Sequence, residues 1–219
     1  MIFLFDEKKH VYTLDGKRLF GVTNVLSTIA KPALIQWSAD ETAKHLGWEN
    51  PKYETLETCL KTAEIALGTI KTLTVEEYYK KLGEARVAHC KKKEAAADKG
   101  KNVHSQIEEL VKEAIEKNNG VLHSPLTTSK QVLDFINWAG DNNVRFLASE
   151  KQLYSEKMWT GGTCDLMFEM NGKRYVGDIK TTSGIYDRTP FFQCAAYELM
   201  AVEMGEPMFD GRCIVRLGK

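Results

Sequence analysis

Two runs of alternating apolar and polar residues, one on each side of Asn171-Gly172, form the clearest pattern along the chain. Both central residues of a type I′ turn need a positive φ, and Asn-Gly is a dipeptide that this turn favours. The pattern predicts a β-hairpin over residues 163–180, in which the numbers of facing residues sum to 343. In this register Glu169 faces Arg174, an opposite-charge pair that stabilises neighbouring strands.

One pair in this register is unfavourable, because Asp165 faces Asp178. Directly opposed side chains have Cβ atoms about 4.5–5.5 Å apart, and like charges there are destabilising. Period-two alternation places Lys180 on the same face as Asp178. Two acids and a lysine that packing does not explain fit metal-dependent phosphodiester hydrolysis, where the acids hold the cation. The reverse face is apolar and is predicted to be buried: Cys164, Leu166, Phe168, Tyr175 and Ile179.

The other patterns predict a second hairpin and a set of helices and strands. Asp15-Gly16 is a further type I′ signal, which predicts a hairpin within residues 1–22. Apolar positions at helical spacing predict helices over 33–46, 58–68, 75–82, 85–117, 124–143 and 189–204. Strands are expected at 144–150, 153–155 and 212–217. This order predicts an α/β fold with a mixed central sheet flanked by helices.

Composition changes this picture only a little. The 219 residues suit one large domain, or one domain with an insertion, and the formal net charge is zero. No global basic field indicates nucleic acid, so a nucleic-acid path would depend on local clustering. Five scattered cysteines without C-x-x-C indicate a reducing compartment and no zinc or disulfide framework. Neither a leader peptide nor a membrane span is expected, and the expected location is the cytoplasm.

Four short motifs follow one another along the chain: Gly-Lys-Asn-Val-His at 100–104, Gly-Thr-Cys-Asp at 162–165, Gly-Asp-Ile-Lys at 177–180 and Gln-Cys-Ala-Ala-Tyr at 193–197. Together they resemble the PD-(D/E)XK nuclease superfamily, and in particular its RecB-like and phage-type exonuclease branch. The resemblance implies a single domain over 1–219 with a restriction-endonuclease-like core at about 100–219. An N-terminal hairpin and a helical elaboration over about 24–99 would complete it.

The resemblance also implies a site. His104, Asp165, Asp178 and the Ile179 carbonyl would hold Mg²⁺ or Mn²⁺. Imidazole is the more natural ligand for Mn²⁺. Asp165, Asp178 and Lys180 would be catalytic, with Lys180 beside the nucleophile. The remaining pair, Gln193 and Tyr197, would position the nucleic-acid strand.

Two acidic side chains near these motifs have open roles. Glu150 precedes the central hairpin and is a further carboxylate that could reach the metal. Glu108 follows His104 by one helical turn, either as its hydrogen-bond partner or as an exposed carboxylate.

Three functions remain open at this point. The first is a metal-dependent DNA exonuclease acting on single- or double-stranded ends, with a single-strand-annealing or recombination protein as a partner. The second is a structure-specific endonuclease on the same core. The third is a catalytically inactive nuclease fold that binds nucleic acid. Intact Asp165, Asp178 and Lys180 favour an enzyme, because a binding module does not need paired acids near a phosphate.

Overall fold

The computed structural model describes residues 1–29, 31–123 and 129–218. The chain divides into two compact units, one formed by Met1–Ala30 with Gly100–Lys219 and the other by Lys31–Lys99. We call them the core unit and the helical unit. The division falls inside one long helix, α5 (Ala88–Lys117), which is continuous through Gly100.

The helical unit consists of α2 (Pro32–His45), α3 (Leu56–Lys71), α4 (Val75–Arg86) and the beginning of α5. These helices lie where the apolar spacing predicts them. A capping box starts α4, with Thr74 accepting from the Glu77 amide and the Glu77 side chain accepting from the Thr74 amide. This reciprocal pair satisfies two backbone donors that a helix start leaves without partners. An ion pair between Lys92 and the buried Glu41 joins α5 to α2 within this unit.

A mixed sheet forms the centre of the core unit. Strands β5 (Arg145–Ser155), β6 (Thr160–Met170) and β7 (Lys173–Lys180) run antiparallel, and β8 (Gly211–Arg216) pairs in parallel with β7. Helix α7 (Thr189–Glu203) connects the two parallel strands. A short strand, β4 (Phe20–Gly21), pairs in parallel with the start of β6. The prediction of an α/β fold with a mixed sheet is confirmed.

A three-stranded N-terminal sheet lies beside β6. It contains β1 (Phe3–Asp6), β2 (Val11–Leu14) and β3 (Lys17–Arg18), followed by the short helix α1 (Val22–Leu26). Asp15 and Gly16 both have positive φ, as the predicted turn requires. The Tyr12 hydroxyl lies 2.9 Å from Thr163 Oγ1 and so connects this sheet to β6.

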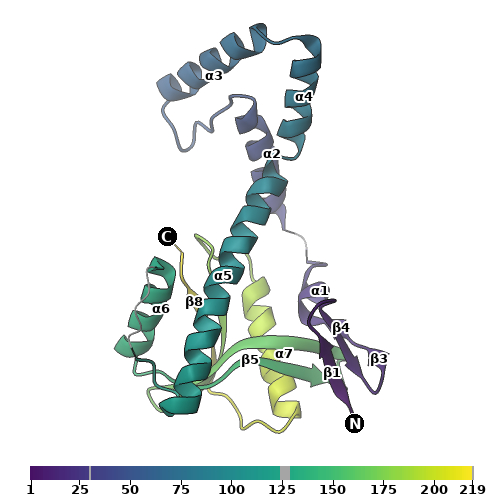
Figure 1. Cartoon of the computed structure of the whole chain (residues 1–219), viewed down its shortest axis with the longest axis vertical. Coiled ribbons are helices and arrows are strands. Elements are labelled where there is room, and N and C mark those ends of the chain that lie inside the picture. Colours follow the sequence, from purple (N-terminus) through teal and green to yellow (C-terminus); the bar gives the residue numbers. More distant parts are fainter. Residues whose placement is uncertain (30, 124–128, 219) are drawn as a thin grey trace. The chain divides into compact units, whose positions relative to one another are not determined.

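Two of the apolar clusters in the described part of the core unit pack helices against the central sheet, and Figure 1 shows these helices around the strands. In the first, buried residues of α5 and of α6 (Lys130–Asp141) pack on the sheet. In the second, α7 and Val22 of α1 pack on the sheet with Met167 and Val176. A further cluster joins Tyr12, Leu14 and Leu19 in the N-terminal sheet. Most of the apolar positions predicted to face the core are buried: Val103, Ile107, Val111 and Ala114 on α5, where Leu110 is half-buried, and Val132, Phe135, Ile136 and Ala139 on α6.

The register of the central hairpin is confirmed over five pairs, from Met170–Lys173 to Leu166–Gly177. Asn171 and Gly172 have φ of 54° and 73°, as a type I′ turn requires. Beyond Leu166 the ladder stops, so the expected direct pairing of Asp165 with Asp178 is wrong. The Ile179 amide instead donates to Asp165 Oδ2 at 2.8 Å. This side-chain bond takes the place of a backbone bond at the point where the two strands stop pairing.

The apolar face of the hairpin also differs from its prediction. Leu166, Phe168 and Ile179 share the first cluster, with Tyr175 at its edge, but Cys164 packs in the second. Alternation is therefore broken between Cys164 and Leu166, where the Cys164 thiol donates to the Leu166 carbonyl. Because α7 covers the other face, both faces of this sheet are buried.

Two sequence predictions can be compared with the structure only over the described residues. The helix predicted over 124–143 is observed as α6 from Lys130 to Asp141, and residues 124–128 lie outside the described residues. Within 1–29, 31–123 and 129–218, the structure contains no helix that combines the length and the apolar character needed to cross a membrane.

Candidate functional site

Asp178 is the most deeply buried acid of the site, with an exposed fraction of 0%. Neither of its carboxylate oxygens accepts a hydrogen bond of good geometry from the described residues. Asp178 Oδ2 forms an ion pair with Lys180, whose Nζ lies 2.5 Å away. Burial, followed by the nearby charge of Asp165, raises the pKa of Asp178 to about 6. A buried carboxylate that the fold leaves so poorly satisfied is costly unless it binds something.

Asp165 lies at the point where β6 and β7 stop pairing. Its Oδ2 accepts from the Ile179 amide and lies 3.7 Å from His104 Nδ1. Burial raises the pKa of Asp165, while the bond from Ile179 and the charge of Lys180 oppose that rise. The second acid of the hairpin is therefore also held in a dry environment.

His104 reaches this point from α5. Its neighbours Val103 and Ile107 are buried in the first cluster, and this fixes the face that α5 turns toward the sheet. A Cβ on Gly100 would lie 3.0 Å from Thr181 Oγ1, so the glycine allows α5 to approach the segment that follows β7. Burial, followed by the charge of Lys180, lowers the pKa of His104, although Asp178 and a hydrogen bond to the Ile179 backbone oppose this. The imidazole is thus held neutral, the form that ligates metals.

Glu150 completes the cluster from β5. One ligand atom from each of His104, Glu150 and Asp165 lies within 4.8 Å of the other two. Burial, followed by the charges of Asp165 and Glu108, raises the pKa of Glu150 to about 8. Glu150 has φ of 48° in the middle of a strand, an unusual conformation for a residue other than glycine. Strained backbone of this kind gathers at functional sites.

The position of Glu150 could be only partly anticipated. Its place before the hairpin makes it a candidate carboxylate, but its positive φ has no sequence signal. Glu108, by contrast, forms an ion pair with Lys112 one turn later on α5. It acts on the site through its charge, since it raises the pKa of Glu150.

Lys180 connects the acids to α7. Its Nζ lies 2.5 Å from Asp178 Oδ2 and 3.5 Å from Gln193 Oε1. The Gln193 side-chain amide donates to the Tyr197 hydroxyl at 2.9 Å. Tyr197 is only 2% exposed, and its ring lies against Gly162, where a Cβ would be 2.6 Å from Cε1. The motifs at 177–180 and 193–197 are thus joined through Tyr197, Gln193, Lys180 and Asp178, while the other two motifs meet where His104 approaches Asp165.

The side chains of this cluster fit a divalent cation by their chemistry. These side chains offer carboxylate oxygens and a neutral imidazole, and the Ile179 main-chain carbonyl lies on the same strand as Asp178. Such a donor set suits Mg²⁺ or Mn²⁺. The unsatisfied oxygens of Asp178 are the structural observation behind this fit. His104, Glu150 and Asp165 would hold the cation, because their ligand atoms lie within 4.8 Å of one another. Asp178, which the sequence predicts as a ligand, is not part of this group and lies beside Lys180.

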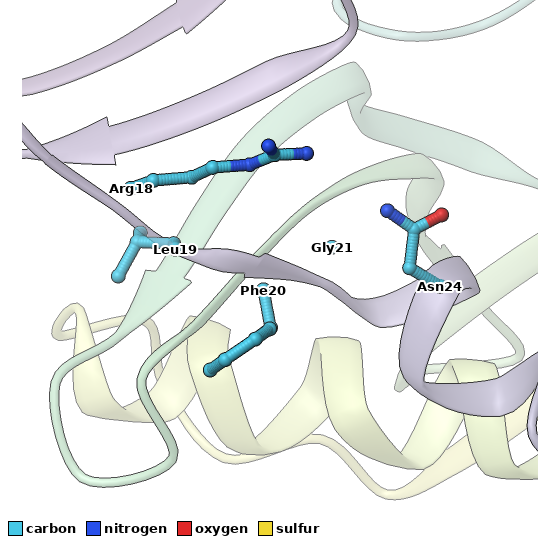
Figure 2. A pocket seen from close by; sticks show the side chains of 5 residues that line it. All are labelled: Arg18, Leu19, Phe20, Gly21 and Asn24. Carbon is cyan, nitrogen blue, oxygen red and sulfur yellow. The ribbon is translucent and has the colours of Figure 1, made fainter.

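A pocket of about 410 Å³ lies elsewhere in the core unit, lined by Arg18, Leu19, Phe20, Gly21 and Asn24. Figure 2 shows the side chains of Arg18 and Asn24 on one side of the β4 backbone and that of Phe20 on the other. The pocket contains none of the clustered acids. It is connected to them through β6, because Gly21 pairs with Gly161, four residues before Asp165.

The class of protein defined by these observations is an α/β protein with a buried carboxylate, histidine and lysine cluster at the opening of a β-hairpin. No protein-family model matches the chain, and no curated protein matches it. Function must therefore be argued from the site.

Proposed function

We propose that the protein is a divalent-metal-dependent DNA exonuclease built on a restriction-endonuclease-like core. The observation that carries the proposal is the cluster itself, in which two buried acids lie beside one lysine and one neutral histidine. Packing alone gives no reason to bury Asp178 beside its Lys180 partner in the core of the site. The resemblance of the four motifs to RecB-like nucleases supports the same assignment.

Each residue of the cluster has a distinct role in this proposal. His104, Glu150 and Asp165 hold the cation, and the resemblance adds Asp178 and the Ile179 carbonyl as further ligands. A divalent cation bound there lowers the pKa of water and neutralises charge on the scissile phosphate. Lys180, held between Asp178 and Gln193, places its positive charge beside the attacked phosphate. Because Tyr197 is buried, we propose that it holds the Gln193 side chain in place and that Gln193 contacts the DNA strand.

Cleavage of end-labelled linear DNA in Mg²⁺, Mn²⁺ or EDTA tests the proposal. We expect metal-dependent loss of nucleotides from the ends, abolished in Asp178→Asn and lowered at least about 100-fold in Lys180→Ala, as for the loss of one electrostatic stabiliser. Matched controls are Asp134→Asn on the surface of α6 and Lys173→Ala at the exposed start of β7. Both control variants should cleave like the wild type.

A covalently closed circle separates the proposed exonuclease from the alternatives. An exonuclease leaves the circle intact, whereas cleavage of the circle would make the protein an endonuclease on the same core. Binding of DNA in EDTA, with no cleavage of any substrate by folded wild type, would indicate an inactive binding module. The same set of reactions therefore decides among all three functions.

A further inference from the structure

Three large aromatic side chains are exposed immediately beside the site. Tyr186, Phe191 and Phe192 are 71%, 51% and 46% exposed, and Arg188 between them is exposed as well. We call these four residues the aromatic patch. They occupy the end of the connection that follows Lys180 and the first turn of α7, directly before Gln193. None of the roles proposed above uses them.

The connection that carries the patch is ordered by specific contacts. The hydroxyls of Ser183 and Tyr186 lie 2.6 Å apart, and Gly184 allows the Tyr186 ring to approach its backbone, since a Cβ there would lie 3.1 Å from Cζ. Arg216 of β8 donates to the Ser183 carbonyl at 3.0 Å. At the helix start, the Thr189 amide donates to Asp187 Oδ1 at 2.7 Å. Tyr186 is therefore presented to solvent with its hydroxyl already bonded, so that a ligand would meet the ring.

The composition of the patch indicates what would cover it. Aromatic rings and an arginine exposed on one short segment are the combination on which unpaired bases stack and to which phosphates bind. In a duplex each base is already stacked on its neighbours, so a duplex offers these rings no free base face. Aromatic residues and arginine are also enriched in protein interfaces, so a protein contact is the competing outcome of the test.

The segment that carries the aromatic patch is continuous with the site, which gives a path for a nucleic-acid strand. Five residues lie between Tyr186 and Phe192 in the sequence. The segment that carries the patch begins after Lys180 and ends before Gln193, and these two residues contact each other. We propose that the aromatic patch is a stacking platform for single-stranded nucleic acid. It holds unpaired bases while the backbone of the same strand leads to the acids and Lys180. This inference rests on the proposed function, and it names single-stranded ends as the substrate class.

Binding of a fluorescent single strand of about 12 nucleotides, within the range that such surfaces cover, tests the inference in EDTA by anisotropy. We expect Phe191→Ala with Phe192→Ala, and separately Tyr186→Ala, to weaken binding about 5- to 100-fold for each base that loses its partner. Tyr186→Phe retains the ring and should bind like the wild type. Leu199→Ala is the matched control, because Leu199 is a 57% exposed apolar residue on the same helix.

An abasic strand of the same length distinguishes stacking from other causes. It offers phosphates without bases, so we expect the wild type and the aromatic variants to bind it equally. Unchanged affinity of the alanine variants for the normal strand would overturn the inference. An equal loss for the normal and abasic strands would overturn it too, because the rings would then act on the backbone or on the fold.

The outcome is independent of cleavage. If the wild type binds single strands through the patch but cleaves nothing in Mg²⁺ or Mn²⁺, the platform stands and the nuclease proposal fails. If cleavage occurs but the alanine variants bind and degrade single strands normally, the nuclease stands and the platform fails. In that case, if Leu199→Ala and the aromatic variants all lose association with a second copy of the chain or with a co-purified protein, the patch is a protein-contact surface.

Discussion

Replacement of Asp178 by asparagine tests the site without any substrate. The native fold raises the pKa of this carboxyl from its ordinary value of 3.8 to about 6, chiefly by burial. Since one pKa unit corresponds to about 1.4 kcal/mol, the ionised form destabilises the folded protein by about 3 kcal/mol relative to the protonated form. Asparagine has nearly the same shape as the protonated acid and carries no charge, so it avoids this penalty.

The sign of the pH dependence follows from the raised pKa. Below pH 3.8 the carboxyl is protonated in both the folded and the unfolded chain, and its ionisation contributes nothing. As the pH rises from there through about 6, the unfolded chain releases its proton first, and the folded protein loses stability. In EDTA we therefore expect Asp178→Asn to become progressively more stable than the wild type between about pH 4 and pH 7. The final difference of about 3 kcal/mol corresponds to roughly 6–12 °C in Tm.

Addition of Mn²⁺ or Mg²⁺ should reverse the order. A cation that binds only the folded state stabilises it by about 4.1 kcal/mol at 1,000 times its Kd, which exceeds the difference of about 3 kcal/mol, and only the wild type keeps the carboxylate that holds it. Thermal unfolding followed by circular dichroism, from pH 4 to 8 with EDTA or metal, gives both results. A difference between the two proteins that does not change with pH, or equal stabilisation of both by metal, would refute the reasoning.

Three further substitutions test the surroundings of the site. Glu150→Gln should be more stable than the wild type in EDTA above about pH 8, and not at pH 4.5, because burial raises the pKa of Glu150 from 4.5 to about 8; urea unfolding at the two pH values measures this. Gly162→Ala should lower stability by about 1–3 kcal/mol, since its Cβ would meet the Tyr197 ring, whereas Gly68→Ala in the open interior of α3 should raise it by up to about 1 kcal/mol. Phe135→Ala, which empties a fully buried position, should lower the free energy of unfolding by about 3–5 kcal/mol in the same measurement.

Much of the fold could be predicted because its signals are local. Asn171-Gly172 and Asp15-Gly16 each specify a turn through the φ that glycine and asparagine tolerate, and the first of these turns sets the register of the five hairpin pairs. The apolar stripes of α5 and α6 repeat every three or four residues and are buried as expected. Strand β1 was not predicted, because its four residues gain their order from pairing with β2 and not from their own pattern.

The site could be predicted by its members more readily than by its geometry. Asp165, Asp178 and Lys180 were found from the hairpin register, and the structure brings all three together with His104. The register misled at one step, because the ladder ends at Leu166 and the Ile179 amide turns to the Asp165 side chain. A strand that breaks its alternation at one residue leaves no trace in the pattern of apolar positions. The same limit applies to Glu150, whose positive φ depends on tertiary contacts.

The charges of the cluster lead to a last argument about what it binds. Asp165, Asp178 and Glu150 supply three carboxylates, Lys180 supplies one positive charge, and burial holds His104 neutral. When the acids are ionised, the cluster carries a net charge of −2 in an environment that raises the pKa of every one of its acids. Protonation can remove that charge at low pH, as the raised pKa values of Asp178 and Glu150 indicate. Once Glu150 is ionised as well, above about pH 8, one divalent cation balances the charge of −2. A second lysine in place of the cation would leave the ligand oxygens with no common centre. We therefore propose that a metal ion offsets the charge of these acids, and a metal ion beside a lysine suits phosphodiester hydrolysis.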